Sequence, residues 1–127
     1  MPFDAATFPY VRMYQPAGQP RDVAAEFAEF DALLAREQPF VIVCDPRSEE
    51  QGEPDRDERT QVALWKRDRR AALKLYVKGM VMIEPDNARR LVTGPFAKFA
   101  SKFWGYPVEV VADSAQARLQ AQAWLNQ

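Results

Sequence analysis

Residues 39–44, PFVIVC, form a continuous apolar run of strand length. A run without polar alternation is typical of a strand that is covered on both faces, as in a parallel sheet. A second such run, GMVMIE, occupies residues 79–84, and a third, PVEVVA, occupies residues 107–112. Upstream, residues 8–15 (FPYVRMYQ) alternate polar and apolar side chains and predict one N-terminal strand. Four strands are therefore expected.

Amphipathic segments separate and follow these strands. In each of them apolar residues recur at spacings of three and four, which predicts helices. Asp86 and Asp113 precede two of the segments as N-caps, and Gln116 completes a capping-box spacing with Asp113. The predicted helices are residues 22–37, residues 59–78, residues 87–104 with an interruption or restart at Gly94-Pro95, and residues 113–126.

The order of these elements is β-α-β-α-β-α-β-α. Such alternation predicts a mostly parallel sheet with right-handed crossovers and with helices packed against it. We find no internal repeat and no long linker, so the sequence predicts one α/β domain over residues 1–127 with a four-stranded, mostly parallel sheet.

The composition excludes several kinds of site. The 127 residues include no histidine and one cysteine, Cys44, which excludes a Ser-His-Asp or Cys-His nucleophile within one chain and makes structural zinc implausible. Seventeen basic and eighteen acidic residues nearly cancel, whereas nucleic-acid binding usually needs a basic domain. We therefore expect no binding to nucleic acid. No segment resembles a signal peptide or a membrane span, so we expect a cytoplasmic protein.

An acidic segment follows the 39–44 strand. Residues 45–58 (DPRSEEQGEPDRDE) hold seven acidic residues against two arginines, with two prolines and a glycine, and predict a solvated loop. We call this segment the acidic loop and predict that it binds a partner protein. Its acidic residues are Asp45, Glu49, Glu50, Glu53, Asp55, Asp57 and Glu58.

Basic residues line one side of the long helix predicted over residues 59–78. Four of them form a strict i, i+4 series, which we call the basic ridge: Lys66, Arg70, Lys74 and Lys78. The ridge is either a solvated stripe or a docking face for an acidic partner or an anionic head group. Leu64 and Leu75 lie on a third side of the same helix, where we expect contact with the 96–104 segment rather than with a second subunit.

Arg69 falls within the apolar face of that helix, between Trp65 and Tyr76. A charged group there either extends its head to water, pairs with a carboxylate, or meets an anionic ligand. If it meets a ligand, the expected pocket consists of Trp65, Arg69, Phe99 and Trp104, with Lys98 as another cation for an anionic head group. Aromatic residues at helical spacing are more often part of a core.

In parallel α/β sheets, ligands bind beyond the carboxyl ends of the strands. Those ends carry Cys44 and Asp45, then Glu84 and Asp86, then Asp113. Carboxylates there can bind a cation or act as an acid/base pair, but two of them are also helix caps. No glycine-rich phosphate loop follows any strand. We therefore expect no catalytic residue, no cofactor and no metal.

Three stretches together resemble STAS domains, the family of bacterial anti-sigma-factor antagonists and their relatives: FVIVCDPR, RAALKLYVKGMVMIEPDNARR and VEVVADSAQARLQAQAWL. The resemblance covers about residues 39–125 and implies a small, non-catalytic domain that binds proteins or apolar ligands. Two features depart from the family pattern. The family begins with a β-hairpin, where one strand is predicted here. The family's phosphorylated Asp-Ser-Ser-Gly-like turn has no counterpart, and neither Ser48 nor Thr60 matches it.

Three functions follow from these observations. The first is a non-enzymatic regulatory or inhibitor domain, of the immunity or antitoxin type, that binds another protein through the acidic loop and the basic ridge. The second is a small-molecule or lipid-binding domain that uses the aromatic segment 96–104. The third, an enzyme, is the least favoured because no motif demands it. A homodimer is compatible with the sequence.

Overall fold

The computed structural model describes residues 3–14, 23–44 and 56–126. These residues form five strands and five helices in the order β-β-α-β-α-α-β-α-β-α. The strands are β1 (Phe3–Thr7), β2 (Tyr10–Met13), β3 (Phe40–Cys44), β4 (Val77–Ile83) and β5 (Val108–Val111); the helices are α1 (Val23–Leu34), α2 (Arg56–Asp68), α3 (Arg70–Tyr76), α4 (Asn87–Trp104) and α5 (Ser114–Leu125).

The sheet has the strand order β1-β2-β3-β4-β5, so each strand lies beside its predecessor in the sequence. Strands β2 to β5 are parallel to one another, and β1 is antiparallel to β2. The α/β class and the mostly parallel sheet are confirmed, but the predicted count of four strands is wrong.

The additional strand lies at the N-terminus. The prediction of a single strand over residues 8–15 is wrong, because Phe8 and Pro9 form a turn with a cis peptide bond between β1 and β2. β1 reads FDAAT, in which Phe3 and Thr7 are the only aromatic or β-branched residues, so its β-forming tendency is weak. It pairs with β2 all the same, and its Phe3 ring meets Phe30 of α1 edge-to-face, with 5.4 Å between centroids.

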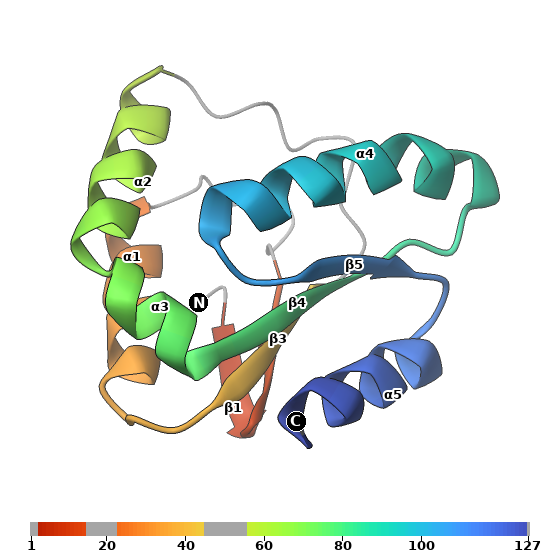
Figure 1. Ribbon diagram of the computed structural model, residues 1–127, viewed down its shortest axis with the longest axis horizontal. Coiled ribbons are helices and arrows are strands. Elements are labelled where there is room, and N and C mark those ends of the chain that lie inside the picture. The colour runs from red at the N-terminus through yellow and green to blue at the C-terminus, as the bar shows by residue number, and fades with distance from the viewer. Residues whose placement is uncertain (1–2, 15–22, 45–55, 127) are drawn as a thin grey trace.

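The helices divide unequally between the two faces of the sheet. When parallel strands are added in one direction through right-handed crossovers, all the crossover helices fall on the same face. Helices α1 to α4 contribute to one buried cluster together with Val11, Phe40 and Ile42. Helix α5 packs on the opposite face against Val41 and Val81, and Figure 1 shows α4 and α5 on opposite sides of the strands.

Strand β3 shows why the central runs are apolar throughout. Phe40 and Ile42 point toward helices α1 to α4, whereas Val41 points toward α5, and all three are fully buried. The prediction of strands covered on both faces is confirmed for β3. The pairing of β3 with β4 shifts by one residue at this point, because Phe40 pairs with Val77 but Val41 pairs with Gly79. β4 therefore has one extra residue here, Lys78.

Two predicted helix boundaries are wrong. The helix expected over residues 59–78 consists of two helices, α2 and α3, with Arg69 at the break in a non-helical conformation (φ −116°, ψ 15°). Conversely, α4 continues through Gly94 and Pro95 without an end. Pro95 and Leu91 are both exposed, so water can reach the Leu91 carbonyl that Pro95 leaves without an amide partner.

The two predicted N-caps are confirmed. The Asp86 carboxylate accepts a hydrogen bond from the Arg89 amide at the start of α4 (3.1 Å). The Asp113 carboxylate accepts one from the Gln116 amide (2.9 Å), and the Gln116 side chain accepts one from the Ala112 amide (3.0 Å). Both helix starts are thereby fixed by local sequence. No helix in the described parts of the chain is long and apolar enough to cross a membrane.

Candidate functional site

The acidic loop lies almost entirely outside the described residues. Asp45, Glu49, Glu50, Glu53 and Asp55 fall in the undescribed range 45–55, so the predicted role of that part in partner binding stays a prediction. Helix α2 begins at Arg56, earlier than expected, and its first turn includes the other two acidic positions. Asp57 is exposed there, and Glu58 is helical.

The predicted basic ridge is not one helical face, because the helix that should carry it is broken at Arg69. Lys66 is in α2, and Arg70 and Lys74 keep their i, i+4 spacing on the exposed side of α3. Lys78 is not in a helix but in β4, where it is partly buried. The Lys66 ammonium lies over the Phe103 ring of α4, 3.9 Å from its centroid, in a cation–π contact.

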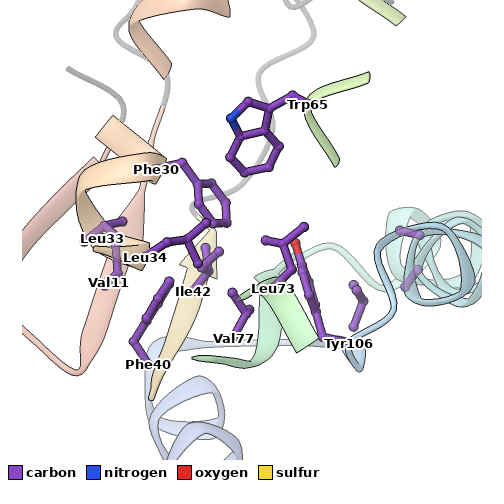
Figure 2. Close-up of a cluster of buried hydrophobic side chains, with 13 residues drawn as sticks. Val11, Phe30, Leu33, Leu34, Phe40, Ile42, Trp65, Leu73, Val77 and Tyr106 are labelled. Atoms are coloured by element: carbon purple, nitrogen blue, oxygen red, sulfur yellow. The ribbon is translucent and has the colours of Figure 1, made fainter. Parts of the chain in front are cut away.

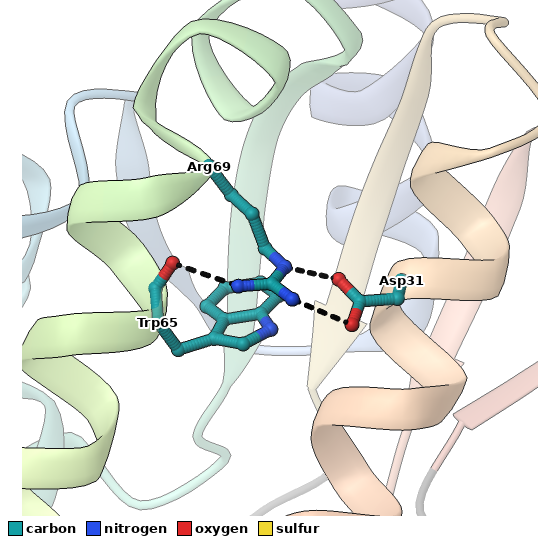
Figure 3. Close-up of polar contacts among 3 residues, drawn as sticks. All are labelled: Asp31, Trp65 and Arg69. Atoms are coloured by element: carbon teal, nitrogen blue, oxygen red, sulfur yellow. Dashed lines mark hydrogen bonds and ion pairs between the residues drawn. The ribbon is translucent and has the colours of Figure 1, made fainter.

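Arg69 forms an ion pair with Asp31. Of the three alternatives left open by the sequence, pairing with a carboxylate is therefore the one that the structure shows. Nε bonds to one carboxylate oxygen of Asp31 and Nη2 to the other (3.0 Å), so the contact is bidentate. Nη1 donates to the Trp65 carbonyl (3.4 Å), and the guanidinium lies over the Trp65 ring, 4.9 Å from its centroid. Figure 3 shows this bridge joining α1 to the break between α2 and α3.

Trp65 belongs to the core. Its ring stacks on Phe27 with 5.0 Å between centroids, and it meets Phe30 edge-to-face at 4.9 Å and Trp104 at 6.4 Å. Figure 2 shows Trp65 beside Phe30 at one end of the buried cluster. The Trp65 indole nitrogen is buried and has no hydrogen-bond partner among the described residues.

The predicted four-residue pocket does not form as a unit. Trp65 contacts both Arg69 and Trp104, but Phe99 is 66% exposed whereas Trp104 packs against the buried cluster. The expected contact of Leu64 and Leu75 with the 96–104 segment stays a prediction; Leu64 is 47% exposed and Leu75 is 61% exposed.

The outward side of α4 carries a group of residues that sequence reasoning missed. Leu91 is 81% exposed and Val92 is 77% exposed, and both lie on the same side of the helix as Phe99. Lys98 and Lys102 are exposed on that side as well. We call these five residues the α4 surface. The spacing of these residues places them on one side of a continuous helix. The interruption predicted at Gly94-Pro95 hid this pattern, because it placed Leu91 and Phe99 in different segments.

The polar groups at the strand ends have structural partners. The buried Glu84 carboxylate accepts a hydrogen bond from the Asp86 amide (3.1 Å), while Arg90 donates to the Glu84 carbonyl (3.0 Å). Asp86 and Asp113 cap helices. Across the residues that the structure describes, no three His, Cys, Asp or Glu side chains gather closely enough to share a metal ion.

Sulfur-containing side chains occupy the same edge of the sheet. The Cys44 thiol lies 3.8 Å from the Met13 thioether, and Met82 lies on the next strand. Tyr106 belongs to the same buried cluster, is 3% exposed, and has a hydroxyl with no hydrogen-bond partner among the described residues. Burial raises the pKa of Tyr106, and nearby Cys44 raises this pKa further.

No family model matches the chain, and neither a curated protein nor a solved structure matches it.

Proposed function

We propose that this chain is a non-enzymatic, STAS-like regulatory domain that binds an acidic partner protein through the α4 surface. The observation that carries the proposal is the exposure of Leu91, Val92 and Phe99 on one side of one helix. Single exposed apolar residues are common on protein surfaces. Three large ones grouped on one face are typical of an interaction site, because a partner removes all of them from water together.

The charge of α4 indicates the chemistry of the partner. The helix sequence contains four basic residues and no carboxylate: Arg89, Arg90, Lys98 and Lys102. Arg90 is engaged with the carbonyls of Glu84 and Pro85, but Lys98 and Lys102 lie exposed beside the apolar side chains. An acidic rim on the partner, around an apolar centre, would complement this surface and accelerate association.

The form of the exposed surface favours a protein over a lipid bilayer. The inner side of α4 packs on the sheet through Ala97 and Ala100, so the helix offers only its outward side. An interfacial membrane helix buries an apolar face several ångströms deep in the head-group region. A narrow group of three side chains flanked by lysines suits insertion into a pocket of a folded partner better.

The fold adds support to the proposed family. The β1–β2 pair is an N-terminal antiparallel hairpin, which removes one of the two departures from the STAS pattern. The phosphorylated turn is still absent from the sequence, so the proposed regulation involves binding without a phosphorylation switch in that turn.

Site-specific crosslinking followed by reconstitution tests this function. A photo-reactive amino acid at Val92 should capture a partner in native lysate, and one at Leu119 of α5 should not. The purified partner should then bind with micromolar or better affinity, and high salt should weaken the binding. Phe99→Ser should reduce affinity by tenfold or more, about 1.4 kcal/mol. Leu119→Ser is the matched control, since Leu119 and Phe99 are both 66% exposed.

Two further measurements give outcomes that would overturn the proposal. Binding of the purified chain to phosphatidylglycerol vesicles, lost in Phe99→Ser, would assign the α4 surface to lipid and favour the second function predicted from the sequence. Light scattering that shows a dimer in the wild type and a monomer in Phe99→Ser would assign the surface to a second copy of this chain.

A further inference from the structure

Three sulfur-containing residues lie side by side on three neighbouring strands. In the sheet register Met13 of β2 pairs with Cys44 of β3, and Cys44 pairs with Met82 of β4. Adjacent parallel strands are about 4.8 Å apart, so in-register side chains on one face are direct neighbours. All three pack against the same cluster and therefore point to the same face. The distance between the Cys44 and Met13 sulfur atoms is 3.8 Å.

The position of the three residues suits a binding site. They lie at or near the carboxyl ends of their strands, where parallel α/β sheets bind ligands. Each of the three residues is only partly buried, so the group lies at the border of the buried cluster rather than inside it. Methionine often fills gaps in a core. That role alone gives no reason for two thioethers to flank a thiol in register.

We propose that Met13, Cys44 and Met82 form a binding site for one Cu(I) ion. Thiolate and thioether ligands are soft and select Cu(I) over the hard cations that carboxylates bind. On binding, the Cys44 thiol releases its proton to water and a sulfur–copper bond forms. One negative ligand and one monovalent ion leave the site neutral, which limits the cost of partial burial.

Competition with a chromophoric Cu(I) chelator, bicinchoninate, tests the site on the full chain under anaerobic conditions. We expect one Cu(I) per chain, withdrawn stoichiometrically from the chelator. Cys44→Ser should abolish this withdrawal. Met13→Leu and Met82→Leu preserve side-chain volume and should each weaken Cu(I) affinity by about tenfold or more.

Met80→Leu is the control for the register. Met80 lies on the same strand and face as Met82 but pairs with Ile42 rather than Cys44, so its variant should keep wild-type affinity. Wild-type protein that cannot compete with the chelator would overturn the proposal. So would wild-type affinity in both Met13→Leu and Met82→Leu, which would indicate a lone thiol, or equal losses in Met80→Leu and Met82→Leu. Circular dichroism of each variant identifies any loss that comes from misfolding.

Discussion

The two faces of the sheet are packed in different ways. On the α5 face, small residues bring the helix close: Ala117 and Ala121 are fully buried, and Gly79 lies under the Trp124 ring. On the other face, helices α1 to α4 enclose large aromatic side chains, among them Trp65 and Tyr106, both with buried polar atoms that lack partners among the described residues.

This difference separates the part of the molecule that stabilises the fold from the part that is suited to function. The close contact of α5 leaves little space and is built from apolar groups. The opposite face tolerates unpaired polar atoms, which cost stability, and it also holds Cys44 and its neighbouring methionines. The α4 surface lies on the outside of that same layer. Both of our proposals therefore concern the face on which some buried polar atoms lack hydrogen-bond partners.

The largest effect should come from filling the space under Trp124. In Gly79→Ala the new Cβ would lie 2.4 Å from two carbon atoms of the indole, so the ring or the strand must move. We expect a loss of about 3 kcal/mol in the free energy of unfolding, measured in urea. The loss should be much smaller in a Trp124→Leu background, where the clash is relieved. A loss below about 0.5 kcal/mol in the wild-type background would show that the α5 face is not tightly packed.

An intermediate effect should come from the ion pair between α1 and the α2–α3 break. Asp31→Ala leaves Arg69 without its carboxylate, and we expect a loss of about 1 kcal/mol, because both side chains are partly exposed (Asp31 40%, Arg69 32%) and screened by water. The matched control is Asp68→Ala, which removes the exposed Asp68–Arg67 pair at 3.8 Å and should cost almost nothing. Equal losses in the two variants would show that the bridge in Figure 3 does not hold the helices together.

The smallest effect should come from removing the Tyr106 hydroxyl. At neutral pH, Tyr106→Phe should leave stability unchanged or raise it by up to about 1 kcal/mol, because the hydroxyl has no partner among the described residues. A clear loss of stability would show that the hydroxyl is hydrogen-bonded in the folded protein.

The same variant predicts a pH dependence with a definite sign. Burial raises the pKa of Tyr106 in the folded protein, whereas in the unfolded chain the phenol ionises near pH 10. The unfolded state therefore loses a proton first, and wild-type stability falls as the pH rises above about 10. Tyr106→Phe lacks this term, so its advantage over the wild type should grow by about 1 kcal/mol between pH 10 and 11. A constant difference across this range would contradict the buried position of Tyr106.

Local patterns predicted much of the fold. The apolar runs located β3, β4 and β5, and the capping residues Asp86 and Asp113 located the starts of α4 and α5. Local reasoning failed where contacts with distant segments outweighed propensity. β1 is a strand because it pairs with β2, despite its weak β-forming sequence.

The candidate sites were less predictable than the fold. Sequence reasoning identified Arg69 as a charge in an apolar face, but its partner Asp31 lies 38 residues away and on another helix. It found the aromatic segment of α4, yet it separated Leu91 from Phe99 by assuming that Pro95 ends a helix. Exposed proline within a helix is tolerated when water can reach the carbonyl that it leaves unpaired.

By itself, the sequence determined the α/β class and the parallel pairing of buried strands, because both follow from the spacing of apolar residues along the chain. Its composition also excluded catalysis by a histidine of this chain. Only the tertiary structure decided which side of α4 faces solvent, and which three strands bring Met13, Cys44 and Met82 into register. These features depend on contacts between segments far apart in the chain, and local patterns do not encode such contacts.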